Sequence, residues 1–225
     1  MAELKIPEIY WDDNEAVRLL VEYFTRRRAK GDLYYSGAYF ERLGGGGDNE
    51  ADANRFTSDD LVAITMLGVH VRGHGAVDLL TDPDGHWARL LSAIPRSARL
   101  EDPDSAPLVA EGGPAWQLWE CLRDAEKYPN KPDGVGPVVA GKLLARKRPR
   151  LIPVYDIRVK SLLERPKVDN TFWAALHQAL QADEMALYRQ LLRLREKAGI
   201  GDDIAALRVF DVIAWMHEGE RQAAA

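Results

Sequence analysis

Hydrophobic residues recur along this chain at intervals of three and four positions. Near the N-terminus, for example, Ala16, Leu19 and Tyr23 share one side of a helix. No stretch alternates apolar and polar residues as a half-buried strand does. The pattern therefore predicts an all-α protein. Its roughly ten helices are expected near 13–30, 58–71, 74–81, 86–94, 115–127, 137–147, 157–164, 171–182, 185–198 and 203–217.

Glycine and proline mark the expected connections between these helices. Four consecutive glycines at 44–47 have no side chains to pack, so a flexible loop is expected over 44–55. Four prolines and two glycines make 95–114 the longest irregular connection. The aromatic-rich segment 33–40 is expected to be irregular or a short strand.

One connection differs because two glycines lead directly into a helix. Gly134 and Gly136 can form a tight turn whose backbone N–H groups approach a phosphate closely. Pro137 suits the first position of the helix that follows, where its missing N–H group is not needed. The positive end of that helix faces the same turn. The arrangement predicts an anion site, although an ordinary turn has the same sequence features.

Basic residues are concentrated after this turn. The chain has a net charge of −5, yet the window 142–160 holds seven cations against the single acid Asp156 and is therefore +6. Such local polarity indicates a nucleic-acid backbone site, with a solvated basic face as the alternative. The residues predicted to contact DNA are Gly134, Val135, Gly136, Val138, Lys142, Arg146, Lys147, Arg148 and Arg158.

The turn, the helix and the apolar strip before Asp156 resemble the helix-hairpin-helix of the DNA glycosylase superfamily, typified by endonuclease III. In that pattern the catalytic aspartate stands twenty residues after the second glycine, and Asp156 stands twenty after Gly136. Ala140 matches the alanine four residues after that glycine, and the helix expected from residue 58 resembles an early helix of the superfamily. The run 147–156 also resembles one in a bacterial family of unknown function, which supplies no activity.

The resemblance implies a two-lobed helical fold. One lobe would span about 57–148, with the hairpin at 115–148, and the other would combine 1–43 with 156–218. It also implies duplex DNA as the partner and Asp156 as an ionised catalytic carboxylate that stabilises a cationic sugar and activates water. Bases would stack on aromatic side chains, for which the candidates are Tyr35, Tyr39 and Tyr155.

Departures from the superfamily limit the possible chemistry. Val138 occupies the position of the lysine that attacks the sugar in glycosylases that also cleave the backbone. The single cysteine, Cys121, excludes a four-cysteine iron–sulfur cluster and is expected to be buried. No histidine pattern completes a metal site, so no metal or other cofactor is expected. Any glycosylase activity would be monofunctional.

Three functions follow from these observations. The first is a non-catalytic protein that grips the DNA backbone, and the second is a monofunctional N-glycosylase that uses Asp156. The third is a protein-interaction module on a retired glycosylase scaffold, which the acidic remainder of the chain favours. Asp156 is equally well placed to cap the helix that follows it. With no apolar run of about 20 residues, no signal core and one cysteine, we expect a cytoplasmic protein without membrane contact, associated with the nucleoid if it binds DNA.

Overall fold

The structure is a computed structural model that describes residues 4–124, 126–128, 131–165 and 171–224. Within these ranges the regular elements are helices, and the only strand-like pairing is an isolated bridge between Arg27 and Leu33, so the all-α prediction is confirmed. The α-helices are α1 (Asp13–Thr25), α2 (Ser58–Thr65), α3 (Gly73–Thr81), α4 (His86–Ser92), α5 (Ala106–Val109), α6 (Pro114–Arg123), α7 (Pro137–Lys147), α8 (Ile157–Leu162), α9 (Phe172–Ala198) and α10 (Ala206–Ala224). Short 3₁₀ turns lie at Glu8–Tyr10, Ser36–Tyr39, Leu43–Gly45 and Pro103–Ser105.

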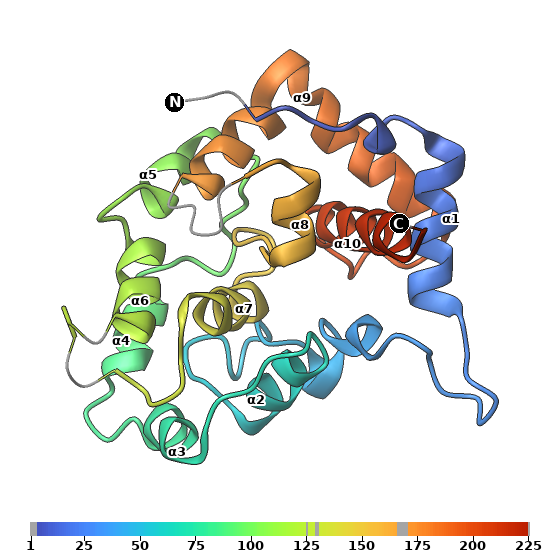
Figure 1. Cartoon of the computed structure of the whole chain (residues 1–225). Coiled ribbons are helices and arrows are strands. Elements are labelled where there is room, and N and C mark those ends of the chain that lie inside the picture. The colour runs from blue at the N-terminus through green and yellow to red at the C-terminus, as the bar shows by residue number, and fades with distance from the viewer. Residues whose placement is uncertain (1–3, 125, 129–130, 166–170, 225) are drawn as a thin grey trace.

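The helices pack in two groups (Figure 1). In one group α10 contacts α1, α8 and α9, and α1 also contacts α9. In the other group α7 lies between α2 and α6, and α6 also contacts α4 and α5. The first group joins the beginning of the chain to its end, while the second holds the middle of the chain.

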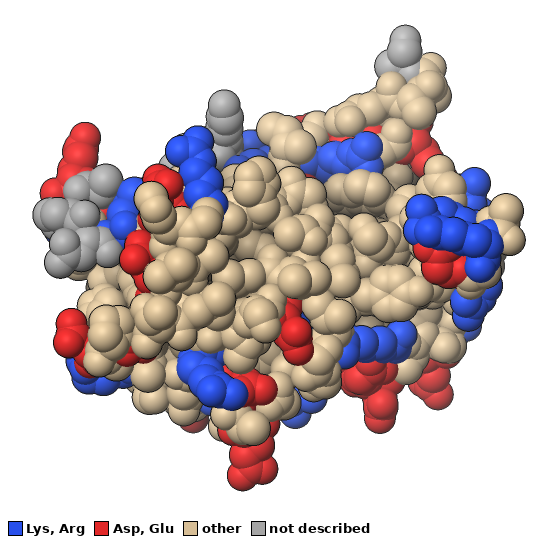
Figure 2. All heavy atoms as spheres, turned by 90° about the horizontal axis from the view of Figure 1, so that it is seen from below, with Lys and Arg blue, Asp and Glu red and all other residues tan. Residues whose placement is uncertain are grey.

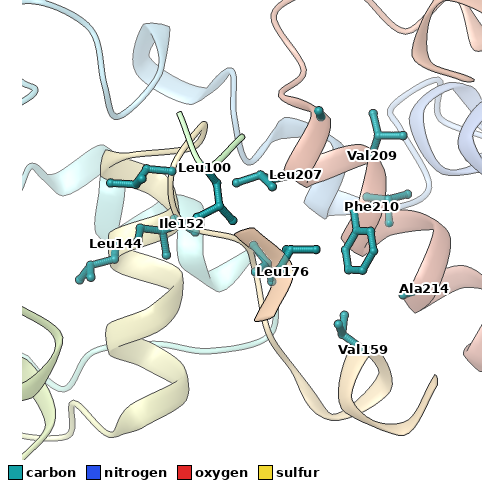
Figure 3. Close-up of a cluster of buried hydrophobic side chains, with 14 of the residues drawn as sticks. Leu100, Leu144, Ile152, Val159, Leu176, Leu207, Val209, Phe210 and Ala214 are labelled. Atoms are coloured by element: carbon teal, nitrogen blue, oxygen red, sulfur yellow. The ribbon is translucent and has the colours of Figure 1, made fainter. Parts of the chain in front are cut away.

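One hydrophobic core runs through both groups. Figure 3 shows Leu144 of α7 and Ile152 on one side of this core, with Leu176 of α9 and Phe210 of α10 on the other. All four side chains are at most 1% exposed. Burying an aliphatic or aromatic side chain of this size contributes about 1.5–3 kcal/mol to stability. Tyr10 closes the core by stacking on Phe210, with ring centroids 4.6 Å apart.

Several helix ends lie where the sequence predicted them. Thr57 and Asp60 form a reciprocal capping box at the start of α2. Asp156 caps α8 by accepting hydrogen bonds from two backbone N–H groups. Gly199, at a φ of 62°, ends α9 in the left-handed conformation that glycine tolerates. Capping residues in the sequence therefore correctly predicted where these helices begin or end.

Other element boundaries differ from the prediction. The helices expected over 13–30 and 58–71 end earlier, at Thr25 and Thr65, and the connection over 95–114 includes the single turn of α5. The two helices expected at 171–182 and 185–198 both lie within the single element α9. The break between them falls at the expected place. At that break three consecutive residues, Asp183, Glu184 and Met185, have φ values of 48°, 55° and 64°.

The glycine-rich segment packs on α7. Gly46 and Gly47 are buried, and a Cβ atom added to Gly47 would lie 2.4 Å from the carbonyl oxygen of Arg146. Only glycine allows the two backbones to approach this closely. The expectation that this segment cannot pack is therefore wrong, because backbone contact replaces side-chain contact. None of the described helices has the length and apolar character needed to cross a membrane.

Candidate functional site

The predicted turn lies at the exposed start of α7. Gly134 has a φ of 72°, and Gly136 is the N-cap residue, with no side chain capping the helix. Lys131 donates to the carbonyl oxygen of Val135 at 3.0 Å, which holds the turn. The first backbone hydrogen bond of α7 runs from Ala140 to Gly136, so the N–H groups of the preceding turn have no helical acceptor. Val138, predicted to contact DNA, is exposed there, whereas the Val135 side chain is buried.

A second helix begins beside this turn. A Cβ atom added to Gly75, in the first turn of α3, would lie 2.1 Å from the carbonyl oxygen of Asp133. Arg72 is the N-cap residue of α3, which also lacks a side-chain cap, and its side chain lies over Gly134. The Arg72 guanidinium is 70% exposed, with the Asp133 carboxylate 3.9 Å away. Two positive helix ends and a solvent-accessible guanidinium therefore share one surface.

The basic block after the turn belongs to the protein interior. Four side chains predicted to contact phosphate are at most 3% exposed: Lys142, Arg146, Lys147 and Arg148. At about 1.5 Å per helical residue, the last three also lie roughly 15 Å from the turn, at the other end of α7. The expectation that these four cations grip an external phosphate is therefore corrected, because the fold covers the side of α7 that bears them.

Asp60 of α2 neutralises two of these cations. It accepts from Arg146 Nε at 3.1 Å and from Lys147 Nζ at 2.9 Å, and its side chain is 1% exposed. The remaining Arg146 nitrogens donate to the carbonyl oxygens of Phe40, Glu41 and Leu43. A buried ion triad of this kind holds α2, α7 and the segment after α1 in one arrangement, since its charges have no solvent to replace a lost partner.

Arg148 is satisfied almost entirely by backbone carbonyl groups. Its guanidinium donates to five oxygens, which belong to Ala53, Asn54, Leu91, Ile94 and Lys147. Burial lowers the pKa of Arg148 to about 10. The role of this side chain is to fix three chain segments around the end of α7.

Burial of these cations makes the rest of the molecule more acidic. Among the described residues, the buried charged side chains comprise six cations and four acids, a formal net charge of +2: Lys142, Arg146, Lys147, Arg148, Lys160 and Arg208 against Asp60, Glu101, Asp211 and Glu218. Because the whole chain is −5, the remaining residues together carry −7. A phosphate-binding surface is therefore restricted to places where backbone N–H groups or single cations are locally exposed.

Asp156, the candidate catalytic residue, lies at the start of α8 with a side chain that is 16% exposed. Its carboxylate accepts from the N–H groups of Arg158 at 3.1 Å and Val159 at 3.3 Å. Lys142 Nζ is 3.9 Å from its Oδ2 atom and donates to the carbonyl oxygen of Leu67 at 2.7 Å. Arg158 is half-buried, with its guanidinium 4.1 Å from the centre of the Trp215 ring. Asp156 therefore caps a helix and keeps part of its carboxylate accessible.

Behind Asp156 lies a buried cluster centred on Arg208 of α10. Its guanidinium donates to the Asp211 carboxylate and to the Tyr23 hydroxyl, the latter at 2.7 Å, and its Nε atom is 2.8 Å from Glu41 Oε1. Burial raises the pKa of Asp211 to about 8, against the lowering effect of Arg208 and with a further increase from Glu41 and Asp156. The carboxyl group of Asp211 therefore lies close enough to Asp156 for their charges to interact.

The candidate base-stacking tyrosines differ in exposure. Tyr35 stacks on Tyr23 with ring centroids 5.2 Å apart, and Tyr155 stacks on Phe172 at 4.1 Å. Each of these rings therefore has one face covered by the protein. Tyr39 is 38% exposed, and its hydroxyl accepts a hydrogen bond from a backbone N–H group. Tyr39 thus has the most accessible ring of the three.

Sequence reasoning missed two sets of buried charges. The pair Arg208 and Asp211 left a signal, because both interrupt an otherwise apolar stretch of a predicted helix. The carboxylate of Asp60 gave no signal of its buried partners, because these cations lie more than 80 positions further along the chain. The exposed Arg72 beside the turn also gave no signal, since only the fold brings it there.

Comparison with known proteins assigns the chain to a family whose function is unknown. No curated protein and no solved structure matches the chain. The resemblance to helix-hairpin-helix glycosylases therefore stays a prediction. A family model for DUF6308, a family of unknown function, matches residues 16–218. Since this match covers most of the sequence, the chain belongs to the DUF6308 family.

Proposed function

We propose that the chain binds the phosphate backbone of duplex DNA at the surface formed by residues 72–75 and 134–138, here called the paired-turn surface. The observation that carries the proposal is the close contact of two helix starts without side-chain caps, α3 and α7. Unpaired N–H groups and the positive ends of both helix dipoles favour phosphate oxygens there. The exposed guanidinium of Arg72 adds a cation beside them.

The acidic remainder of the molecule limits this binding to a local contact. If each helix start binds one phosphate, the logarithm of the binding constant should fall with the logarithm of salt concentration with a slope of about −2. The neighbouring carboxylate of Asp133 opposes phosphate, so its removal should strengthen binding. A weak, salt-sensitive and sequence-independent interaction is the expected behaviour.

Fluorescence anisotropy with a labelled duplex at low salt tests the paired-turn surface. Arg72→Gln should raise Kd about fivefold, as expected for the loss of about 1 kcal/mol, while Asp133→Asn should lower it. Arg28→Gln is the matched control, because Arg28 is also exposed and also lies beside an aspartate, in the loop after α1. Equal effects of the two arginine substitutions, or a flat salt dependence, would contradict the proposal.

A second candidate function is hydrolysis of an N-glycosidic bond by Asp156. The observation that favours it is the partly accessible carboxylate beside Lys142, with Asp211 behind it. In this reaction the bond between C1′ and the base nitrogen breaks, and the base leaves with a proton. A water oxygen then bonds to C1′ and the water releases a proton, which balances the proton taken up by the base, while the Asp156 carboxylate stabilises the cationic sugar and orients the water.

Release of bases from a panel of damaged duplexes tests this candidate. Asp156→Asn should abolish release while leaving thermal stability nearly unchanged, because asparagine is an equally good N-cap residue. Asp12→Asn is the matched control, since Asp12 caps α1 in the same way on another helix. Release that continues at the wild-type rate in Asp156→Asn would exclude this carboxylate from the reaction.

An uncharged face favours the third candidate, a protein-interaction module. Figure 2, which views the molecule from below the orientation of Figure 1, shows a broad uncharged area with charged side chains mainly toward its edges. On α2 and α3, three aliphatic side chains are between 43% and 56% exposed: Val62, Val77 and Leu80. Recovery of one protein partner and no DNA in a low-salt pull-down would favour this candidate over DNA binding.

A further inference from the structure

The structure points to a second anion site, at the end of α7 opposite the paired-turn surface. A cavity of about 290 Å³ lies between the glycine-rich segment, the C-terminal end of α7 and the start of α10. We propose that this glycine-loop cavity binds a phosphate group through the backbone N–H groups of Gly47 and Asp48 and the guanidinium of Arg150, all of which line it. The site does not depend on the proposed DNA-binding function.

Two buried cations bind carbonyl groups on both sides of the four consecutive glycines. Arg146 binds three carbonyl oxygens between residues 40 and 43, and Lys147 Nζ binds that of Asp52 at 2.8 Å. The amide of Asn49 binds the carbonyl oxygen of Gly46 at 2.6 Å. These bonds anchor the chain on both sides of the glycines and hold the segment against the end of α7.

Two consecutive N–H groups in this segment have no acceptor. Gly45 and Gly46 donate back to the preceding turn at 3.1 Å, whereas Gly47 and Asp48 donate to no group in the described part of the chain. Gly47 is nevertheless buried, because its backbone lies against that of Arg146. Successive free N–H groups in a glycine turn form the concave cradle that binds phosphate oxygens in many proteins.

Charge pairing leaves one cation free at this cavity. Two of its three carboxylates are paired, Asp203 with Arg42 at 2.5 Å and Glu41 with Arg208 at 2.8 Å, while Asp48 interacts electrostatically with the buried guanidinium of Arg148. Arg150 is exposed, and its guanidinium has no hydrogen bond or ion pair among the described residues. An anion that enters the cavity therefore meets an unpaired guanidinium and two unpaired N–H groups.

The cavity is large enough for a phosphate group on a small molecule. The same group could belong to a free phosphomonoester or to a nucleic-acid backbone that runs past the cavity. Both sources present tetrahedral oxygens to the same donors, so the chemistry of recognition is shared. The two sources can be distinguished by whether a small phosphomonoester is enough to saturate the site.

Titration of the ¹⁵N-labelled full chain with inorganic phosphate tests the proposal by NMR. The amide signals of Gly47 and Asp48 should shift and saturate, while chloride at equal ionic strength should not move them. Arg150→Gln should raise the apparent Kd at least about fivefold. Arg28→Gln, a control with the same charge change, should leave it unaltered. Arg72→Gln should also leave it unaltered, which separates this site from the paired-turn surface.

Two further titrations identify the source of the phosphate. Saturation by a nucleoside 5′-monophosphate, with no response to a duplex, would assign the cavity to a free phosphomonoester. A duplex that shifts the same two signals and competes with inorganic phosphate would assign it to the backbone. The proposal is overturned if phosphate produces no saturable shift of Gly47 and Asp48, or if Arg150→Gln binds phosphate as tightly as the wild type.

Discussion

Replacing Asp60 by alanine should destabilise the chain by about 3–5 kcal/mol, because the change leaves two buried cations without their carboxylate. Arg146 and Lys147 both bind Asp60, and all three side chains are at most 1% exposed. Neither cation can turn to water without moving α7 away from α2. The free energy of unfolding, measured by urea denaturation at neutral pH, should show the loss directly.

Asp59→Ala is the matched control for this experiment. Asp59 is the exposed neighbour of Asp60 in the first turn of α2, so both substitutions remove a carboxylate from the same helix start. Its removal should cost less than about 1 kcal/mol. Asp60→Asn keeps the size of the side chain and should still lose most of the stability, because charge is the missing feature. A loss for Asp60→Ala no larger than that for Asp59→Ala would mean that the basic block is solvated after all.

The positions of the helices were largely predictable because they depend on neighbours in sequence. Apolar spacing and capping residues such as Thr57 and Asp156 act within one or two helical turns. The break in α9 was predictable for the same reason, since the residues around Asp183 interrupt the apolar pattern. Apolar spacing and capping residues do not predict which helix packs against which face of its neighbours.

The basic block shows why the candidate site was harder to predict. From the local charge, the side of α7 that bears Lys142 and Arg146 was predicted to contact phosphate or solvent. In the structure it is covered by Asp60 of α2 and by carbonyl groups of the segment 40–54. These partners lie between about 85 and 106 positions earlier in the chain, beyond the reach of periodicity or local charge patterns.

The turn at Gly134 and Gly136 and the buried cations at the other end of α7 therefore have different roles. Gly134 and Gly136 lie at the accessible start of α7, and their proposed function depends on α3 as a neighbour. The cations further along α7 order the glycine-rich segment, which creates the second proposed anion site. Both proposals depend on backbone N–H groups, which composition and charge counts do not reveal.

Asp211 should make the stability of the chain fall as pH rises from about 4 to 8. Its pKa is raised to about 8 by burial, whereas an aspartate in the unfolded chain has a pKa of about 3.9. Between these values the folded state holds a proton that the unfolded state releases. The contribution of this proton is complete below about pH 4 and declines by at most about 1.4 kcal/mol per pH unit until about pH 8.

Burial is the largest cause of the raised pKa of Asp211, and the charged groups that face this carboxyl modify it. Arg208 of α10 favours the ionised carboxylate, while Glu41 from the segment after α1 and Asp156 at the start of α8 oppose it. One guanidinium thus lies between two buried carboxyl groups, and one of the two carboxyl oxygens of Asp211 has no hydrogen-bond partner among the described residues. Retaining a proton on Asp211 removes the excess negative charge from this dry environment.

Comparison of the wild type with Asp211→Asn at pH 5, 6.5 and 8 tests this assignment. Asparagine resembles the protonated acid and does not titrate. As pH rises the wild type should therefore lose stability, and the variant should become more stable in comparison. Asp13→Asn is a control of opposite sign. Hydrogen bonding to Lys197 lowers the pKa of Asp13 to about 2, so its difference from wild type should stay constant over this range and change only in acid. If the curves of Asp211→Asn and wild type run parallel from pH 5 to 8, Arg208 outweighs burial and Asp211 is ionised in the folded protein.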